Sequence, residues 1–191
     1  MEFRDKIICF HEEVAMAKWI IDPDHSVASF AVRHMMVSDV HGQFNKISGA
    51  IQFDPSDLTP SSVEAEIDVT GIYTGIQKRD EHLKSPDFFD AERYPTIAFK
   101  STKVESAGGR SFRVSGELTM HGVTRPAILN AEHFGPVKGT EEGEAVIGFS
   151  ASTTINREDF GIMWNVALIE KGGVVVGKEV QIALDIEADP A

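Results

Sequence analysis

Strict alternation of apolar and polar residues most constrains the fold of this chain. The clearest run is residues 62–69, whose apolar members are Val63, Ala65, Ile67 and Val69. A two-residue period is typical of strands with one buried face and one exposed face. Similar runs recur at residues 29–34, 47–53, 96–101, 112–120, 145–151 and 180–186. We therefore predict an all-β, antiparallel protein of about eight to ten strands.

Two segments interrupt the alternation. Residues 75–89 have a pattern typical of one short helix, and residues 156–163 are long enough only for a turn. Turn-forming residues separate the other runs, and no repeat or linker divides the chain. We expect one barrel domain over residues 19–191, preceded by an extension over residues 1–18. That extension is either an amphipathic arm or a stretch upstream of a natural start at Met16.

An open sheet of this size would expose two edges, whereas a closed barrel exposes none. A barrel of eight or more strands does not need its interior filled completely. The inward positions are nearly all apolar, and Gly49 and Gly116 leave room among them. The pattern therefore favours a barrel with a dry apolar cavity. A structural or interaction module with a fully packed core remains the alternative.

The charge balance excludes several classes of partner. The 191 residues include 18 Lys and Arg against 30 Asp and Glu, a net charge of −12 at pH 7. The basic residues are scattered, so we expect no nucleic-acid partner.

The single Cys9 cannot form an internal disulfide, which favours a reducing compartment. With no secretory pattern and no apolar run of about 18 residues, we expect a cytoplasmic protein without a membrane span.

Motifs for catalysis and metal binding are weak. Residues 172–178 match the glycine and lysine positions of a phosphate-binding loop, but Glu179 replaces the hydroxyl residue and no βαβ pattern surrounds them. None of the seven histidines forms a metal-binding motif. We expect no catalytic residue, no metal and no cofactor. The alternative is an enzyme that acts on a small hydrophobic substrate, with Asp80 and His82 as acid and base.

Two specific elements stand out, Arg-Asp-x-His-Leu-x-Ser at residues 79–85 and Leu-Thr-x-x-Gly-Val-Thr at residues 118–124. Together with residues 19–26, 30–34, 40–44, 94–99 and 159–161, they resemble the YceI-like family of polyisoprenoid-binding proteins. The resemblance implies a lipocalin-like barrel with an elongated apolar pore. It also implies a long amphiphilic ligand, such as a polyisoprenoid or isoprenoid quinone, that is sequestered or transported unchanged. Because dimers occur among relatives, a homodimer is a further expectation.

The inward-facing positions of the alternating runs predict which residues form the wall of the pore. The predicted apolar lining is Phe30, Val32, Ile51, Phe53, Ile67, Val69, Ile97, Phe99, Phe112, Val114, Leu118, Ile147, Phe149, Ile182 and Leu184. A buried polar head group without a partner would cost about 1–3 kcal/mol or more, so we expect it at a polar mouth. The candidates for that mouth are Arg79, His82 and Ser85, where Arg79 could donate paired N–H groups to a phosphate.

Overall fold

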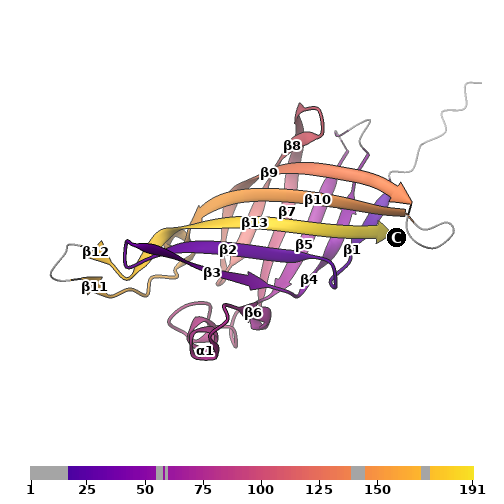
Figure 1. Cartoon of the computed structure of the whole chain (residues 1–191). Helices are drawn as coiled ribbons and strands as arrows, with labels where there is room; N and C mark the ends of the chain where they lie inside the picture. Colours follow the sequence, from indigo (N-terminus) through magenta and orange to yellow (C-terminus); the bar gives the residue numbers. More distant parts are fainter. Residues whose placement is uncertain (1–16, 55–57, 59, 139–144, 169–172) are drawn as a thin grey trace, which may run out of the picture.

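The computed structural model describes residues 17–54, 58, 60–138, 145–168 and 173–191. Eight of its strands are β1 (Lys18–Ile21), β4 (Ile47–Gln52), β5 (Ser62–Asp68), β7 (Thr96–Gly108), β8 (Ser111–Met120), β9 (Val123–Lys138), β10 (Ala145–Asn156) and β13 (Val176–Pro190). In this order each pairs antiparallel with the next, and β13 pairs with β1 (Figure 1). The predicted closed antiparallel barrel is therefore confirmed.

The long strand β13 closes the barrel with two partners in succession. Its last residues pair with β1, and Val176 and residues 180–185 pair with β2 (Val27–His34), with a register shift between Val176 and Val180. Between β1 and β2 the chain leaves the sheet, and Ser26 substitutes for a strand partner there. The backbone N–H of Glu187 donates to Ser26 Oγ at 3.1 Å, and that hydroxyl donates to Glu187 O at 3.3 Å. β3 (Ser38–Phe44) and β6 (Ile72–Tyr73) extend the sheet beyond β2.

Two glycines on the inner face occupy positions where a larger side chain would not fit. Gly116 lies under the ring of Phe99, and a Cβ atom would stand 2.5 Å from Phe99 Cζ. Gly49 has φ +151°, and a Cβ atom there would overlap the carbonyl oxygen of Glu64 on the neighbouring strand. A Cβ atom at Gly116 would also stand 2.5 Å from the carbonyl oxygen of Lys100. Both glycines therefore allow neighbouring backbones to approach closely, and Gly116 in addition makes room for an aromatic ring inside the barrel.

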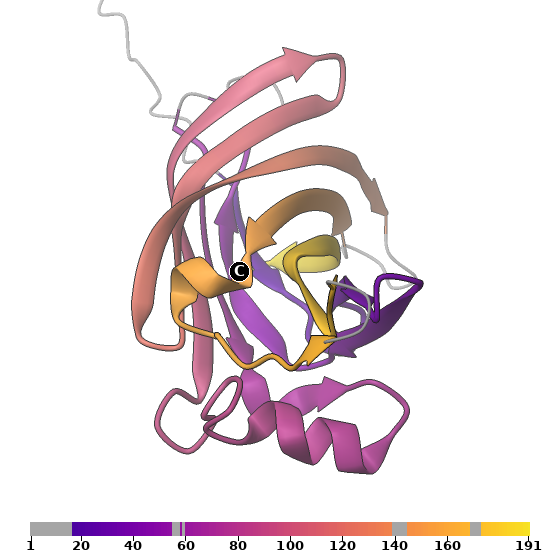
Figure 2. The same ribbon diagram turned by 90° about the vertical axis from the view of Figure 1, so that its left-hand side faces the viewer.

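The helical elements lie at the ends and outside of the barrel. α1 (Gln77–Lys84) lies next to β6 at the edge of the sheet (Figures 1 and 2). The 3₁₀ turns are η1 (Val69–Gly71) and η2 (Arg157–Phe160), so the predicted helix and turn are both present. After η2 the chain crosses the near end of the barrel in Figure 2 and reaches β11 (Ala167–Leu168), which pairs with β12 (Gly173–Val174).

Some predictions concern residues outside the described ranges. These are residues 1–16 of the predicted extension, Cys9 among them, and Gly172 at the start of the loop-like motif. Among the helices that the structure describes, none is both long enough and apolar enough to cross a membrane.

Candidate ligand cavity

The barrel encloses a cavity of about 250 Å³. All eight barrel strands contribute to its wall, together with β2, β3 and residues 83–89. The wall is almost entirely apolar. Its polar residues, among those described, are Ser29, Gln52, Ser61, Ser62, Thr153 and Arg157.

The cavity follows β10 along most of its length. Every second residue of this strand lines the wall from Phe149 through Ala151, Thr153 and Ile155, and Arg157 continues the series just beyond it. Eight residues of extended chain span about 26 Å along the strand. The cavity is therefore elongated, with Phe149 near one end and Arg157 near the other.

Most of the predicted lining residues lie on this wall. Thirteen of the fifteen do so: Phe30, Val32, Ile51, Phe53, Ile67, Ile97, Phe99, Phe112, Val114, Leu118, Phe149, Ile182 and Leu184. Val69 and Ile147 are each 1% exposed, but they are buried elsewhere in the core. Contact of any of these residues with a ligand stays a prediction.

Aromatic rings define one end of the cavity, which we call the Phe53 end. The ring of Phe53 meets that of Phe149 edge-on at 5.1 Å between centroids, and Phe112 lies 5.6 Å away. Nearby on the wall, Ser61 has a buried hydroxyl without a hydrogen-bond partner among the described residues. This end is therefore formed mainly by packed rings.

At the opposite end, the helix segment (residues 74–90) covers the cavity with apolar side chains. Leu83, Phe88 and Phe89 line the wall. The Trp164 ring lies 5.1 Å from that of Phe88 and 5.0 Å from that of His82, and thereby joins this segment to the chain after η2. The segment predicted to form the mouth does border the cavity.

The three polar residues predicted for the mouth have partners within their own segment. Arg79 donates from Nε to Thr74 Oγ1 and from Nη2 to Thr74 O, both at 2.7 Å. His82 Nε2 lies 2.9 Å from Asp87 Oδ2, and Ser85 Oγ donates to His82 O at 2.7 Å. These three are not among the residues that line the cavity. Their role in binding a head group stays a prediction.

The alternative catalytic pair is not assembled as a unit. Asp80 is buried, and its Oδ1 accepts hydrogen bonds from the N–H and the hydroxyl of Thr74. His82 pairs with Asp87 instead. Neither Asp80 nor His82 lines the cavity.

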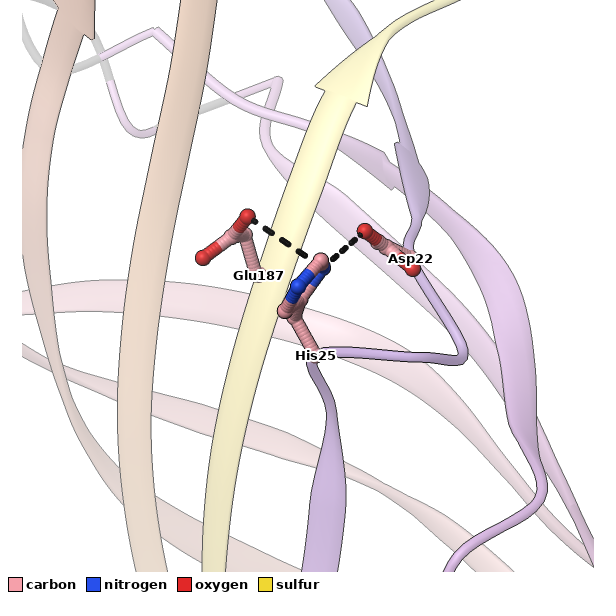
Figure 3. A group of neighbouring side chains, drawn as sticks. All are labelled: Asp22, His25 and Glu187. Atoms are coloured by element: carbon pink, nitrogen blue, oxygen red, sulfur yellow. Dashed lines mark hydrogen bonds and ion pairs between the residues drawn. The ribbon is translucent and has the colours of Figure 1, made fainter. Parts of the chain in front are cut away.

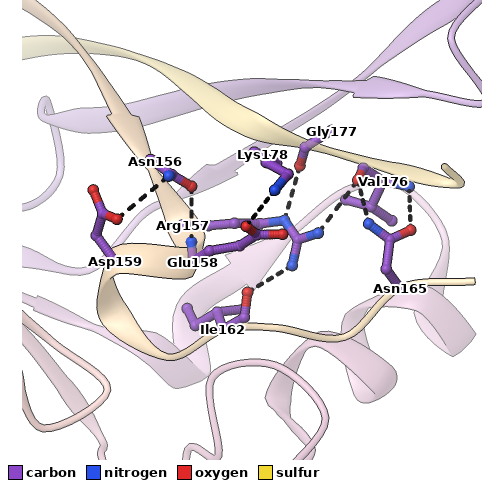
Figure 4. A network of polar contacts seen from close by, with 9 residues as sticks. All are labelled: Asn156, Arg157, Glu158, Asp159, Ile162, Asn165, Val176, Gly177 and Lys178. Atoms are coloured by element: carbon purple, nitrogen blue, oxygen red, sulfur yellow. Dashed lines mark hydrogen bonds and ion pairs between the residues drawn. The ribbon is translucent and has the colours of Figure 1, made fainter. Parts of the chain in front are cut away.

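Arg157 is the charged residue of the wall, among those described, and the sequence analysis missed it. It is 4% exposed and donates from Nε to Gly177 O at 2.8 Å, from Nη1 to Ile162 O at 2.6 Å and from Nη2 to Val176 O at 3.2 Å (Figure 4). Burial lowers the pKa of Arg157, and the charge of Glu158 partly opposes that shift. The signal in the sequence was the β10 alternation, which reaches Arg157 when followed past Ala151.

A second polar group lies outside the cavity, where β1 gives way to β2. His25 Nδ1 is 2.6 Å from Asp22 Oδ2 and 3.7 Å from Glu187 Oε1 (Figure 3). The hydrogen bond to Asp22 raises the pKa of His25, and the same bond lowers the pKa of Asp22. The His25 side chain is 65% exposed, so this is a solvated ion pair at the surface.

We expect His25 to titrate above its ordinary pKa of about 6.5. The pair stabilises the fold fully between the ordinary pKa values of Asp and His, because only there are both partners charged in the unfolded chain. Its contribution is lost as the pH rises through the raised pKa of folded His25, or falls through the lowered pKa of folded Asp22. NMR of the His25 ring protons measures the midpoint.

Asp22→Asn should return the His25 midpoint toward its ordinary value. Asp24→Asn is the matched control, because Asp24 is only a minor cause of the raised pKa of His25. A wild-type midpoint at or below the ordinary value would contradict the pairing.

The fold and the cavity place this chain among the closed antiparallel β-barrels of eight strands, whose interior is wide enough for one small ligand. The YceI-like domain family matches residues 19–188 of this chain. The chain belongs to the YceI-like family.

Individual relatives agree with this assignment. A UPF0312 protein of Vibrio cholerae is 37% identical over 148 residues, which cover 76% of this chain and 78% of the relative. The crystal structure of BcnA from Burkholderia cenocepacia superposes with a TM-score of 0.75 and 25% identity, over 87% of this chain and 98% of BcnA. A polyisoprenoid-binding domain of Saccharophagus degradans has a TM-score of 0.64 over 92% of this chain and 99% of its own. At 16% identity, this likeness shows the shared fold alone.

Proposed function

We propose that this chain binds a long amphiphilic isoprenoid-type lipid inside its barrel, and so sequesters or transports it. The elongated apolar cavity is the observation that carries the proposal. Membership of the YceI-like family supports an isoprenoid ligand, as does the shared fold with the polyisoprenoid-binding domain of Saccharophagus degradans. The predicted homodimer and the predicted cytoplasmic location stay predictions.

The composition of the wall suits such a ligand. Each Å² of apolar surface removed from water contributes about 25 cal/mol, so a hydrocarbon chain gains most from a wall that is apolar along its whole length. Polar groups on the wall would lose hydration without gaining a partner from the hydrocarbon. From Phe149 to Ile155, the β10 wall offers only the hydroxyl of Thr153 as a polar side chain.

Binding of geranylgeraniol, an isoprenoid alcohol, tests the proposal. The full chain is purified without detergent, stripped of bound lipid by unfolding and refolding, and checked by circular dichroism. Native mass spectrometry should then show saturable binding of one alcohol per chain. Organic extraction should return that alcohol unchanged.

Two results would overturn the proposal. A refolded chain that retains no alcohol at saturating concentration does not hold lipid in its cavity. Recovery of a chemically altered alcohol would instead support the alternative, in which the protein is an enzyme.

A further inference from the structure

The wall of the cavity contains a single charged residue among those that the structure describes. Arg157 is buried at 4% exposure and lies on the wall with apolar neighbours such as Ile155 and Ile162. Its hydrogen bonds go to backbone carbonyls rather than to a carboxylate. Glu158, the next residue, pairs instead with Lys178, at 2.8 Å between Oε2 and Nζ.

An arginine in this position has unused bonding capacity. A guanidinium carries five N–H donors, and three are used on Ile162, Val176 and Gly177. One N–H on each of Nη1 and Nη2 has no partner among the described residues. The charge of the adjacent Glu158 offsets the burial of Arg157 only in part, so an anion at this point would stabilise the site further. Arginine often binds carboxylate and phosphate through two parallel N–H donors.

A purely structural role does not account for the positive charge. Arg157 does hold the start of β13, where the register with β2 shifts between Val176 and Val180. Asn165 holds the same strand without any charge: its Nδ2 donates to Val176 O at 2.7 Å, and its Oδ1 accepts from the N–H of Val176 at 3.1 Å (Figure 4). Asn165 thus holds Val176 without a charge, whereas binding an anion requires a cation.

We infer that the lipid is an anionic amphiphile whose phosphate or carboxylate head group binds Arg157, with its hydrocarbon chain extending toward the Phe53 end. This inference rests on the proposed function and specifies its ligand class. The predicted mouth residue His82 lies at the same end of the barrel, against Trp164 and Phe88. The head group is therefore expected at the end of the barrel that the sequence analysis predicted, but bound to Arg157 instead of Arg79.

Competition between two lipids that differ only in the head group tests the inference. The stripped full chain is incubated with an equimolar mixture of geranylgeranyl phosphate and geranylgeraniol, and native mass spectrometry gives the ratio of the two complexes. The phosphate form should be favoured by at least about tenfold, since hydrogen bonds to charged groups are stronger than those between neutral groups. Arg157→Gln should reduce the ratio to about one while geranylgeraniol still binds.

Lys178→Gln is the matched control. It removes the same charge at the same end of the barrel, but Lys178 is 61% exposed and is not a wall residue. This variant should retain the wild-type preference. An excess of inorganic phosphate separates a lipid head group from a free anion, because it should leave the ratio unchanged.

Each outcome decides between the hypotheses. A wild-type chain that binds both lipids equally refutes the inference and leaves the proposed function intact, whereas binding of neither lipid refutes the proposed function. A preference that persists in Arg157→Gln, or that inorganic phosphate abolishes, also refutes the inference. If Arg157→Gln does not fold, the wild-type ratio still tests the inference, and Arg157→Lys should show a smaller preference than wild type.

Discussion

Replacing Ala151 by phenylalanine should reduce the affinity for geranylgeraniol by at least about a hundredfold, equivalent to about 2.8 kcal/mol. Ala151 lies on the cavity wall, two residues from Phe149 and four from Ile155 on β10. Its partners on the adjacent strands, Leu184 and Ala131, also line the wall. An aromatic ring at this point would occupy part of the path that a long hydrocarbon chain must follow to reach the Phe53 end.

The stability of the Ala151→Phe variant should change little, because the ring can enter existing space. Filling a cavity avoids the loss of about 1–3 kcal/mol that overpacking causes in a dense core. Native mass spectrometry measures the occupancy, and thermal unfolding followed by circular dichroism measures the stability.

Ser152→Phe is the control for this variant. Ser152 is the next residue on the same strand, but it is exposed on the outer face of the barrel. This variant should bind geranylgeraniol like the wild type. If both variants bind the alcohol normally, the ligand does not occupy the cavity.

The sequence predicted the barrel and most of its wall because alternation continues wherever a strand continues. The prediction of wall residues from alternation is wrong where a strand ends. β5 stops at Asp68, whose Oδ1 accepts from the N–H of Thr70 at 2.8 Å and begins η1. Val69 therefore leaves the parity of Ile67. Ile147 keeps an inward position, but it pairs with Ala188, beyond Ile186, the last residue of β13 on the wall.

Arg157 shows a second limit of sequence analysis. The alternation of β10 predicts its inward position, but Ser152, Thr153 and Thr154 place polar residues on both faces of the strand and obscure the pattern. Charged residues are also rarely fully buried, so a prediction that selects apolar residues for the wall does not include an arginine. Its partners are carbonyls of residues 162, 176 and 177, which only the tertiary structure brings together.

The polar cluster at residues 79–85 shows a third limit. Its sequence specifies a charged helical segment but not which groups remain available for a ligand. Thr74, which precedes the helix, accepts two hydrogen bonds from Arg79 and donates two to Asp80. The side chains of Arg79 and Asp80 therefore make their hydrogen bonds within the segment. Their chemical type alone had suggested that they were available for a ligand.

Replacing Trp19 by alanine should lower the free energy of unfolding by about 3–5 kcal/mol, the usual cost of truncating a buried aromatic residue. Trp19 is 7% exposed and lies on β1, between Ile51 of β4 and Pro190 of β13. Among the described strands, only β1 connects β4 to β13. The loss therefore falls on the strand that closes the barrel. Chemical denaturation followed by circular dichroism measures it.

Trp19→Phe separates ring packing from hydrogen bonding. The indole Nε1 of Trp19 is buried without a hydrogen-bond partner in the described structure, so phenylalanine removes no bond and retains most of the apolar contact. Its cost should be smaller, about 1–2 kcal/mol. An equal loss in both variants would show that the indole N–H is in fact bonded. A loss below about 1 kcal/mol in Trp19→Ala would show that β1 contributes little to closure.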